Sequence, residues 1–195
     1  MGKTQLFGEI CSAKREVNAE VLEQTVSLAV EIAREGREGR KIGALFVVGD
    51  SGAVTKRSKP LILDPLQGHP DESKRIGNPD MRETIKELAQ LDGAFLVSNA
   101  GVVLSAARYI DAASDSLDLP LGLGSRHVAG ASISRQTNAV AVVVLESSMV
   151  RMFDDGELVS EIVPELWMID GYQSRMEGRI FTRRDEDITV IGRAE

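Results

Sequence analysis

Cysteine is almost absent from this sequence, whose 195 residues include only Cys11. A single thiol excludes an internal disulfide. Its position in a polar segment argues against a metal ligand or a nucleophile, so we expect Cys11 to have no functional role.

Long apolar runs are also absent. No run approaches the roughly 20 residues that an apolar helix needs to cross a bilayer. Residues Met1 to Gln5 are not followed by the apolar core of a signal peptide. We therefore expect a soluble protein of the cytoplasm that does not bind a membrane.

Positive charge is in deficit, because 23 lysines and arginines face 30 aspartates and glutamates, for a net charge of −7. This balance argues against general nucleic-acid binding and against binding to an acidic membrane. It does not exclude ATP, because local arginines and a divalent cation can neutralise a polyphosphate. The charge therefore predicts a metal requirement, with the cation bound together with the nucleotide.

What is present fits a single globular domain, since 43% of the residues are hydrophobic, enough for a core. Apolar positions at helical spacing predict one helix after Asn18 that ends at Gly36, and Asn78-Pro79 predicts the start of a second. Apolar runs bounded by turn residues predict the strands. The predicted strands are 43–48, 53–57, 94–98, 102–106, 139–145, 149–153 and 157–163, with a further helix at 126–136 and a long ordered loop at 59–79.

These elements predict an α/β fold: a single domain with a mixed central β-sheet flanked by α-helices. We divide the chain into a helical segment 1–41, a catalytic domain 42–163 and an extension 164–195 that packs on the domain. The sequence assigns no function to the extension.

Two short motifs mark a candidate site. Asp92 and Gly93 stand where a turn enters the apolar run from Ala94, so a carboxylate is expected at the mouth of a strand. Further along, Gly122 and Gly124 precede Ser125-Arg126-His127 at the start of a predicted helix. Glycines free the backbone, arginine offers a planar charged fork for phosphate oxygens, and a helix N-terminus attracts anions. Together the motifs predict a phosphate-binding site.

The order and spacing of these motifs, followed by the strand from Ala139 to Glu146, resemble the diadenylate cyclase domain family. The similarity covers roughly Ile42 to Ile162. It implies the condensation of two ATP into cyclic di-AMP with release of two pyrophosphates. The chain departs from the family at Val128, where a second arginine is common, and at Leu145, where serine is common.

The resemblance implies a role for each residue. Asp92 would orient or deprotonate the attacking 3′-hydroxyl and, with Glu146, hold Mn²⁺ or Mg²⁺. His127 would contact phosphate or handle a proton. The residues implied in ATP binding are Gly93, Ala94, Gly124, Ser125, Arg126 and His127. Two copies of the chain would meet with their active sites face to face, since each offers one ATP site.

Plainer interpretations of the same residues stay open. An aspartate before glycine often forms a turn, Arg126-His127 could be a solvated helix start, and Glu146 could be the exit of a buried strand. Arg108-Tyr109 is interpreted as a strand end with a solvated arginine rather than as a wall of the adenine pocket, and His69 as a loop-packing residue.

Two other functions also remain possible from the sequence. The first is a sensor that binds ATP or cyclic di-AMP without turnover. The second is a metal-dependent phosphohydrolase that releases AMP or ADP.

Overall fold

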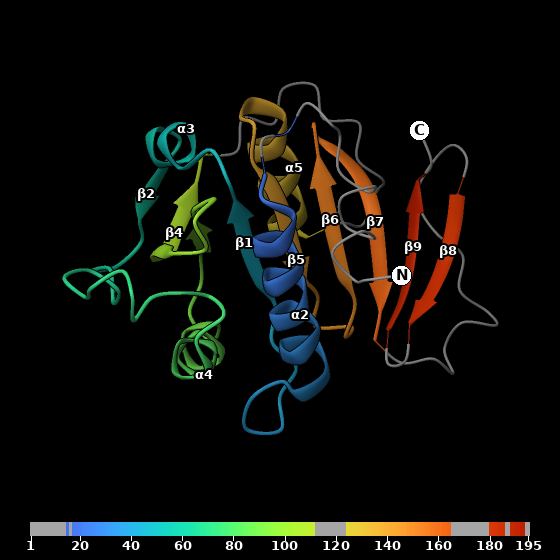
Figure 1. The fold of residues 1–195 in the computed structure, drawn as a ribbon, viewed down its shortest axis with the longest axis horizontal. Helices are drawn as coiled ribbons and strands as arrows, with labels where there is room; N and C mark the ends of the chain where they lie inside the picture. Colours follow the sequence, from blue (N-terminus) through green and yellow to red (C-terminus); the bar gives the residue numbers. More distant parts are fainter. Residues whose placement is uncertain (1–14, 16, 112–123, 165–179, 186–187, 194–195) are drawn as a thin grey trace.

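The computed structural model describes residue 15 and residues 17–111, 124–164, 180–185 and 188–193 (Figure 1). Its strands form one sheet in the order β2-β4-β3-β1-β5-β6-β7-β9-β8. The β1–β3 pair is parallel and every other neighbouring pair is antiparallel, so the predicted mixed sheet is confirmed. The elements are α2 (Ala19–Glu35), β1 (Ala44–Val48), α3 (Ser51–Lys56), β2 (Ser58–Pro60), α4 (Pro79–Leu88), β3 (Ala94–Val97), β4 (Val103–Ile110), α5 (Ser125–Gln136), β5 (Val140–Val144), β6 (Val150–Asp154), β7 (Glu157–Val163), β8 (Ile180–Asp185) and β9 (Ile188–Arg193).

Helices cover both faces of the sheet, as predicted. Alternate residues of a strand point to opposite faces. In β1, Phe46 and Val48 join the core beneath α2 and α4, while Leu45 and Val47 join the core beneath α3 and α5. Figure 1 shows α2 in front of the central strands and α5 behind them. The central strands β1 and β5 are buried along their whole length, which explains why they are apolar on both faces.

The helix starts follow the local signals in the sequence. The Asn18 side chain accepts hydrogen bonds from the backbone N–H groups of Glu20 and Val21, at 2.9 and 3.3 Å. Asn78 caps α4 in the same way, with Pro79 at the first helical position. Gly36 ends α2 with a φ of 62°, in the left-handed region that suits glycine.

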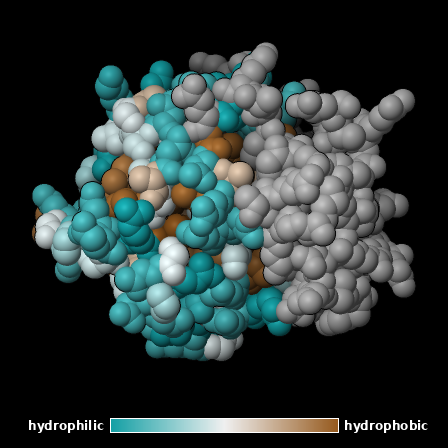
Figure 2. Space-filling model, viewed as in Figure 1, coloured by the Kyte–Doolittle hydropathy of each residue, from teal (hydrophilic) through white to brown (hydrophobic). Residues whose placement is uncertain are grey.

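Ion pairs join the outer faces of α2 and α4. Lys86 Nζ lies 3.0 Å from Glu35 Oε2 and 3.3 Å from Glu31 Oε2, and it also pairs with Glu83 at 3.0 Å. Burial by itself would lower the pKa of Lys86, but the bonds from the three carboxylates outweigh it and raise the pKa above its usual value. The same contact with Lys86 lowers the pKa of Glu83. The part of Figure 2 that covers α4 and the end of α2 is accordingly hydrophilic.

The predicted strand at 53–57 is wrong, because residues 51–56 form the helix α3. A strand at 53–57 would have to pair with β1 in a hairpin. Both edges of β1 are already occupied, by β3 on one side and β5 on the other. The chain turns away at Asp50, whose φ is 37°, and packs only Val54 into the core.

The strand predicted at 102–106 is longer in the structure, because β4 extends to Ile110 and pairs with the short edge strand β2. Beyond β2 the chain is irregular up to α4, as predicted for the loop. Asp64 ties this loop to the sheet: its carboxylate accepts bonds from the backbone N–H of Ala106, at 3.3 Å, and from the Ser105 hydroxyl.

The C-terminal strands continue the sheet, since β9 pairs antiparallel with β7 and β8 pairs with β9. Val190 of β9 joins the core beneath α2. In the parts of the chain that the structure describes, no helix is both long and apolar enough to cross a membrane.

Candidate active site

The candidate residues lie at one end of the sheet. Gly43 precedes β1, Asp92 and Gly93 precede β3, and Glu146 follows β5. β1 and β3 are parallel and β5 is antiparallel to both, with Ala44 opposite Val144. The starts of β1 and β3 therefore coincide with the end of β5, and residues that are 100 positions apart in sequence come together.

Arg126 lies between the two acidic residues. Its Nη2 is 3.5 Å from Asp92 Oδ1, and its Nη1 is 3.8 Å from Glu146 Oε1. The carboxylates are open to solvent, with side chains 92% and 71% exposed, whereas the Arg126 side chain is 33% exposed. The structure thus unites the predicted residues Asp92, Arg126 and Glu146 around one guanidinium.

Arg126 stands in the first turn of α5, whose N-cap is Gly124. Glycine has no side chain with which to cap the first N–H groups, in contrast to Asn18 of α2 and Asn78 of α4. The first turn of α5 also contains no acidic residue, and Ser125 is exposed beside it. A helix N-terminus whose N-cap residue has no side chain, beside an arginine and a serine hydroxyl, can bind a phosphate group. Gly122 lies outside the described residues.

Gly93 is required by the backbone beside Asp92. Its φ is +106°, and a Cβ placed there would lie 2.6 Å from the carbonyl carbon of Ala107. Ala107 has a φ of 51° and lies at an irregularity in the β3–β4 pairing, close to the loop contact made by Asp64. Gly93 therefore lets β3 and β4 approach closely. The position of Asp92 thus depends on a glycine at the next residue.

Gly43 is a site residue that the sequence analysis missed. A Cβ on Gly43 would lie 2.7 Å from Nη1 and 3.1 Å from Cζ of Arg126. The absence of a side chain at residue 43 thus makes room for the guanidinium. The only signal in the sequence is a glycine directly before a fully buried strand, which by itself indicates a close backbone approach but not its partner.

His127 does not join the group around Arg126. The residue is 4% exposed and its ring lies under α5, with Nε2 2.9 Å from Nη1 of Arg151 and the ring plane at 80° to that of Phe153. Successive helical residues point about 100° apart. His127 shares the buried face with Ala131 and Ser134, whereas Arg126 faces Asp92. This position does not favour the predicted direct contact of His127 with phosphate.

Arg108 is bound rather than solvated, contrary to our interpretation. Its Nε donates to Ser58 Oγ and its Nη2 to the Ser58 carbonyl, both at 2.9 Å. The next residue, Tyr109, is exposed, with Lys59 Nζ 5.3 Å from its ring centre. Arg108 therefore fastens the edge strand β2 to β4. His69 is exposed in the loop.

Residues 31–158 match the model of a family described as "DisA bacterial checkpoint controller nucleotide-binding", abbreviated DAC. The chain belongs to this family. The resemblance to the diadenylate cyclase domain is therefore confirmed, and the DAC match includes Asp92, Arg126 and Glu146.

Two curated relatives are diadenylate cyclases by name. The chain is 44% identical over 163 residues to the enzyme of Methanocaldococcus jannaschii, which covers 83% of this chain and 52% of the relative. It is 40% identical over 148 residues to the diadenylate cyclase of Haloferax volcanii, and this alignment covers 75% of this chain and 54% of the relative. The chain thus spans about half the length of these relatives.

Two solved structures are also similar to the chain. One is a hypothetical membrane spanning protein from Bacillus cereus, with a TM-score of 0.49 and 23% identity over 71% of this chain and 62% of the other. The other is a double mutant of DacA from Staphylococcus aureus, with a TM-score of 0.48 and 22% identity over 71% of this chain and 84% of the other.

The carboxylates of Asp92 and Glu146 in this DAC domain offer the oxygen ligands that a divalent cation prefers. Among the described residues, no three histidine, cysteine, aspartate or glutamate side chains gather closely enough to hold a metal by themselves. Asp92 and Glu146 face the same guanidinium and are open to solvent. One or two carboxylates together with substrate phosphates are the usual ligand set for Mg²⁺.

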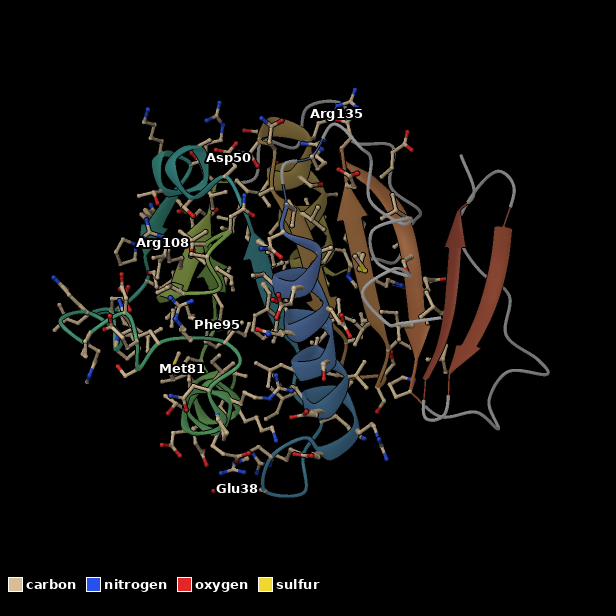
Figure 3. All side chains as sticks on the ribbon, in the orientation of Figure 1. Glu38, Asp50, Met81, Phe95, Arg108 and Arg135 are labelled. Carbon is tan, nitrogen blue, oxygen red and sulfur yellow. The ribbon has the colours of Figure 1, made fainter. Side chains whose placement is uncertain are left out.

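Two surface hollows of the DAC domain lie at the other end of the strands. One, of about 360 Å³, is lined by Asp50 after β1 and Asn138 before β5. The second, of about 580 Å³, is lined by Asn99 after β3. Figure 3 shows Asp50 and Arg135 together at this end, with Glu38 at the opposite one. Neither hollow contains a predicted site residue.

Proposed function

We propose that this chain is a diadenylate cyclase, a divalent-metal-dependent nucleotidyltransferase that converts two ATP into cyclic di-AMP and two pyrophosphates. The observation that carries the proposal is the position of Arg126 at the N-terminus of α5, whose N-cap is a glycine, between the exposed carboxylates of Asp92 and Glu146. Membership of the DAC family and the two relatives named diadenylate cyclase support it.

The phosphates of ATP would replace the carboxylates as partners of Arg126. Both present ion pairs are long, at 3.5 and 3.8 Å, and their carboxylates are mostly exposed, so exchanging them costs little. Arg126 can offer two parallel N–H donors to phosphate oxygens, with the Ser125 hydroxyl and the first N–H groups of α5 beside it. Gly93 and Ala94 would let the nucleotide lie close to the backbone at the start of β3.

The reaction is an in-line displacement. The 3′-oxygen of one ATP forms a bond to the α-phosphorus of the other, the bond from that phosphorus to the bridging oxygen breaks, and pyrophosphate leaves. Asp92 would orient the hydroxyl and accept its proton. Asp92 and Glu146 would hold Mg²⁺ or Mn²⁺ together with the phosphates. The cation would neutralise negative charge on the phosphates and on the leaving pyrophosphate. The same step, repeated, closes the ring.

Two copies of the chain would supply the two nucleotides. Each chain offers one Asp92 and one Arg126, and the product joins two nucleotides head to tail. Asp92 and Glu146 are exposed at an open end of the sheet, so a second copy can approach them. A two-fold arrangement of identical sites places each 3′-hydroxyl near the opposite α-phosphate.

The test is an incubation of the chain with ATP and Mn²⁺ or Mg²⁺, followed by mass analysis of the products. Cyclic di-AMP is expected, and Asp92→Asn should lower its formation by orders of magnitude while the thermal transition stays in place. Asp80→Asn, at the exposed start of α4, is the matched control and should retain full activity. ATP binding without any product would indicate the sensor, and release of AMP or ADP the phosphohydrolase.

A further inference from the structure

Three buried polar side chains form a line beneath α5. Arg151 of β6 donates from Nε to Oε1 of Glu161 on β7 at 2.7 Å, and its Nη1 lies 2.9 Å from Nε2 of His127. All three are almost fully buried: His127 is 4% exposed, Arg151 6% and Glu161 0%. The line therefore crosses from the helix through one strand to the next, inside the protein.

The stability of the fold does not explain this arrangement. Taking two charges out of water costs several kcal/mol for each ion, and well-packed apolar residues in place of a buried ion pair are often neutral or stabilising. A buried ion pair can instead fix one arrangement of the elements that carry it. The element it reaches here is the first turn of α5.

The contact with Arg151 also sets the state of the His127 ring. Arginine only donates hydrogen bonds, so His127 Nε2 must accept, and the ring must be neutral with its proton on Nδ1. A ring fixed in this way cannot rotate without losing its partner. Phe153, edge to face with the ring at 6.0 Å between centres, restricts it further.

His127 is the only buried residue in the first turn of α5. Ser125 and Arg126, the residues directed at the proposed phosphate, immediately precede it. The later part of α5 is held separately, by Gly130 against Val143 and Ala141 of β5. The orientation of the first turn of α5 thus depends on the contacts that hold His127.

We propose that Arg151 and Glu161 are positioning residues, which act through His127 to aim Arg126 and Ser125 at the phosphates. This inference rests on the proposed function, since it takes the N-terminus of α5 as the phosphate site. Neither Arg151 nor Glu161 touches the substrate. His127 then has a different role from the phosphate contact that the sequence suggested.

The ring state can be measured without any activity, because the chain contains only two histidines, His69 and His127. In the full chain labelled with ¹⁵N-histidine, His127 should show an accepting Nε2 and a protonated Nδ1 at neutral pH. His69 supplies the only other histidine signals, and His69→Ala assigns them. A proton on Nε2 of His127 would overturn the inference.

The effect on the site is tested with Arg151→Met combined with Glu161→Leu, which replaces the pair with apolar side chains of similar size. The probe is 3′-deoxy-ATP with Mg²⁺, which lacks the attacking hydroxyl. We expect the His127 signature to be lost and the affinity for the probe to fall roughly tenfold to hundredfold. Met152→Leu, a change at the next position of β6 on the opposite face, is the control and should leave both unchanged.

Arg151→Lys provides the conservative variant and keeps the test open if the double variant fails to fold. A lysine can pair with Glu161 but lacks the fork that serves both neighbours, so its affinity for the probe should lie between those of the wild type and the double variant. Wild-type affinity in folded variants that have lost the His127 signature would refute positioning. Because the probe measures binding, a wild type that makes no cyclic di-AMP would refute the proposed function and not this inference.

Discussion

Replacing Gly43 with alanine should impair the site while leaving the fold in place. Gly43 precedes β1, and its φ lies outside the left-handed region, so alanine can adopt its backbone conformation. The new Cβ would stand 2.7 Å from Nη1 of Arg126 and 3.3 Å from the carbonyl oxygen of Val144. The first contact is too close for any real structure, and the guanidinium must move.

The size of the movement follows from these distances. An ordinary contact is about 3.5 Å, so Nη1 must shift by roughly 0.8 Å. The moving group is the end of a flexible side chain that is one-third exposed, so we expect the free energy of unfolding to change by less than about 1 kcal/mol. A shift of about 1 Å in a positioning group can cost on the order of 100-fold in rate. The loss should therefore appear in phosphate binding and turnover.

The assay compares three glycine variants by thermal unfolding, by affinity for ATP with Mg²⁺ and by formation of cyclic di-AMP. Gly43→Ala should unfold near the wild-type temperature but lose tenfold to hundredfold in ATP affinity or turnover. Gly52→Ala, whose Cβ would meet nothing within 4 Å, is the matched control and should be fully active. Gly93→Ala should unfold at a much lower temperature, because residue 93 has a φ of +106° and its new Cβ would meet backbone atoms of Ala107.

Two outcomes would refute this reasoning. Wild-type ATP affinity in Gly43→Ala would mean that the position of Arg126 does not matter to the nucleotide. A loss of stability as large as that of Gly93→Ala would mean that Gly43 supports the fold rather than the site.

Two further predictions concern the scaffold and the assembly. Lys86→Met should lower the free energy of unfolding by roughly 1–2 kcal/mol, since solvent screens the three exposed carboxylates, without changing ATP affinity. Because the pKa of Lys86 is raised, the stabilisation by its charge is present up to about pH 10 and is lost as the pH rises further. Because the pKa of Glu83 is lowered from 4.5, the part that comes from the Glu83 pair is lost as the pH falls below about 4.5, and unfolding of the wild type and of Lys86→Met across this pH range measures both limits. Specific activity should fall on dilution through the range where a dimer dissociates, and an excess of Asp92→Asn chains should suppress the wild type; constant activity in samples that light scattering shows to be monomeric would contradict face-to-face assembly.

The sequence predicted the parts of the fold that depend on neighbouring residues. Asn18 and Asn78 cap helices because the capping bond joins residues two or three positions apart. The predicted strand at 53–57 was wrong because the partners of β1 come from distant parts of the chain, and the residues near 53–57 do not reveal that both edges of β1 are occupied. In the same way, the close approach of Gly93 to Ala107 depends on an irregular strand pairing.

The structure brings together Asp92, Arg126 and Glu146 of the predicted site residues, but it places His127 elsewhere. Arg126 and His127 are adjacent in sequence and were assigned to the same phosphate. The helical phase of α5 separates them, but the sequence does not reveal which of the two is buried, because positions 130 to 134 are buried on every face of the helix. The Arg151–Glu161 pair could not be predicted, because it depends on the register of β6 with β7.

The way the site is assembled explains why its ion pairs are weak. Asp92, Arg126 and Glu146 come from three elements that are brought together by β1 and its pairing with β3 and β5, so the extended apolar contacts of the sheet determine their positions. The pairs at 3.5 and 3.8 Å then add little to stability, since exposed ion pairs contribute about 0–1 kcal/mol. Under the proposed function, a guanidinium held this loosely by carboxylates would exchange them for phosphate without disturbing the fold, while the buried contact of His127 with Arg151 keeps its turn in place. The rigid part of the site is therefore the buried side of α5, and the exchangeable part is the exposed side.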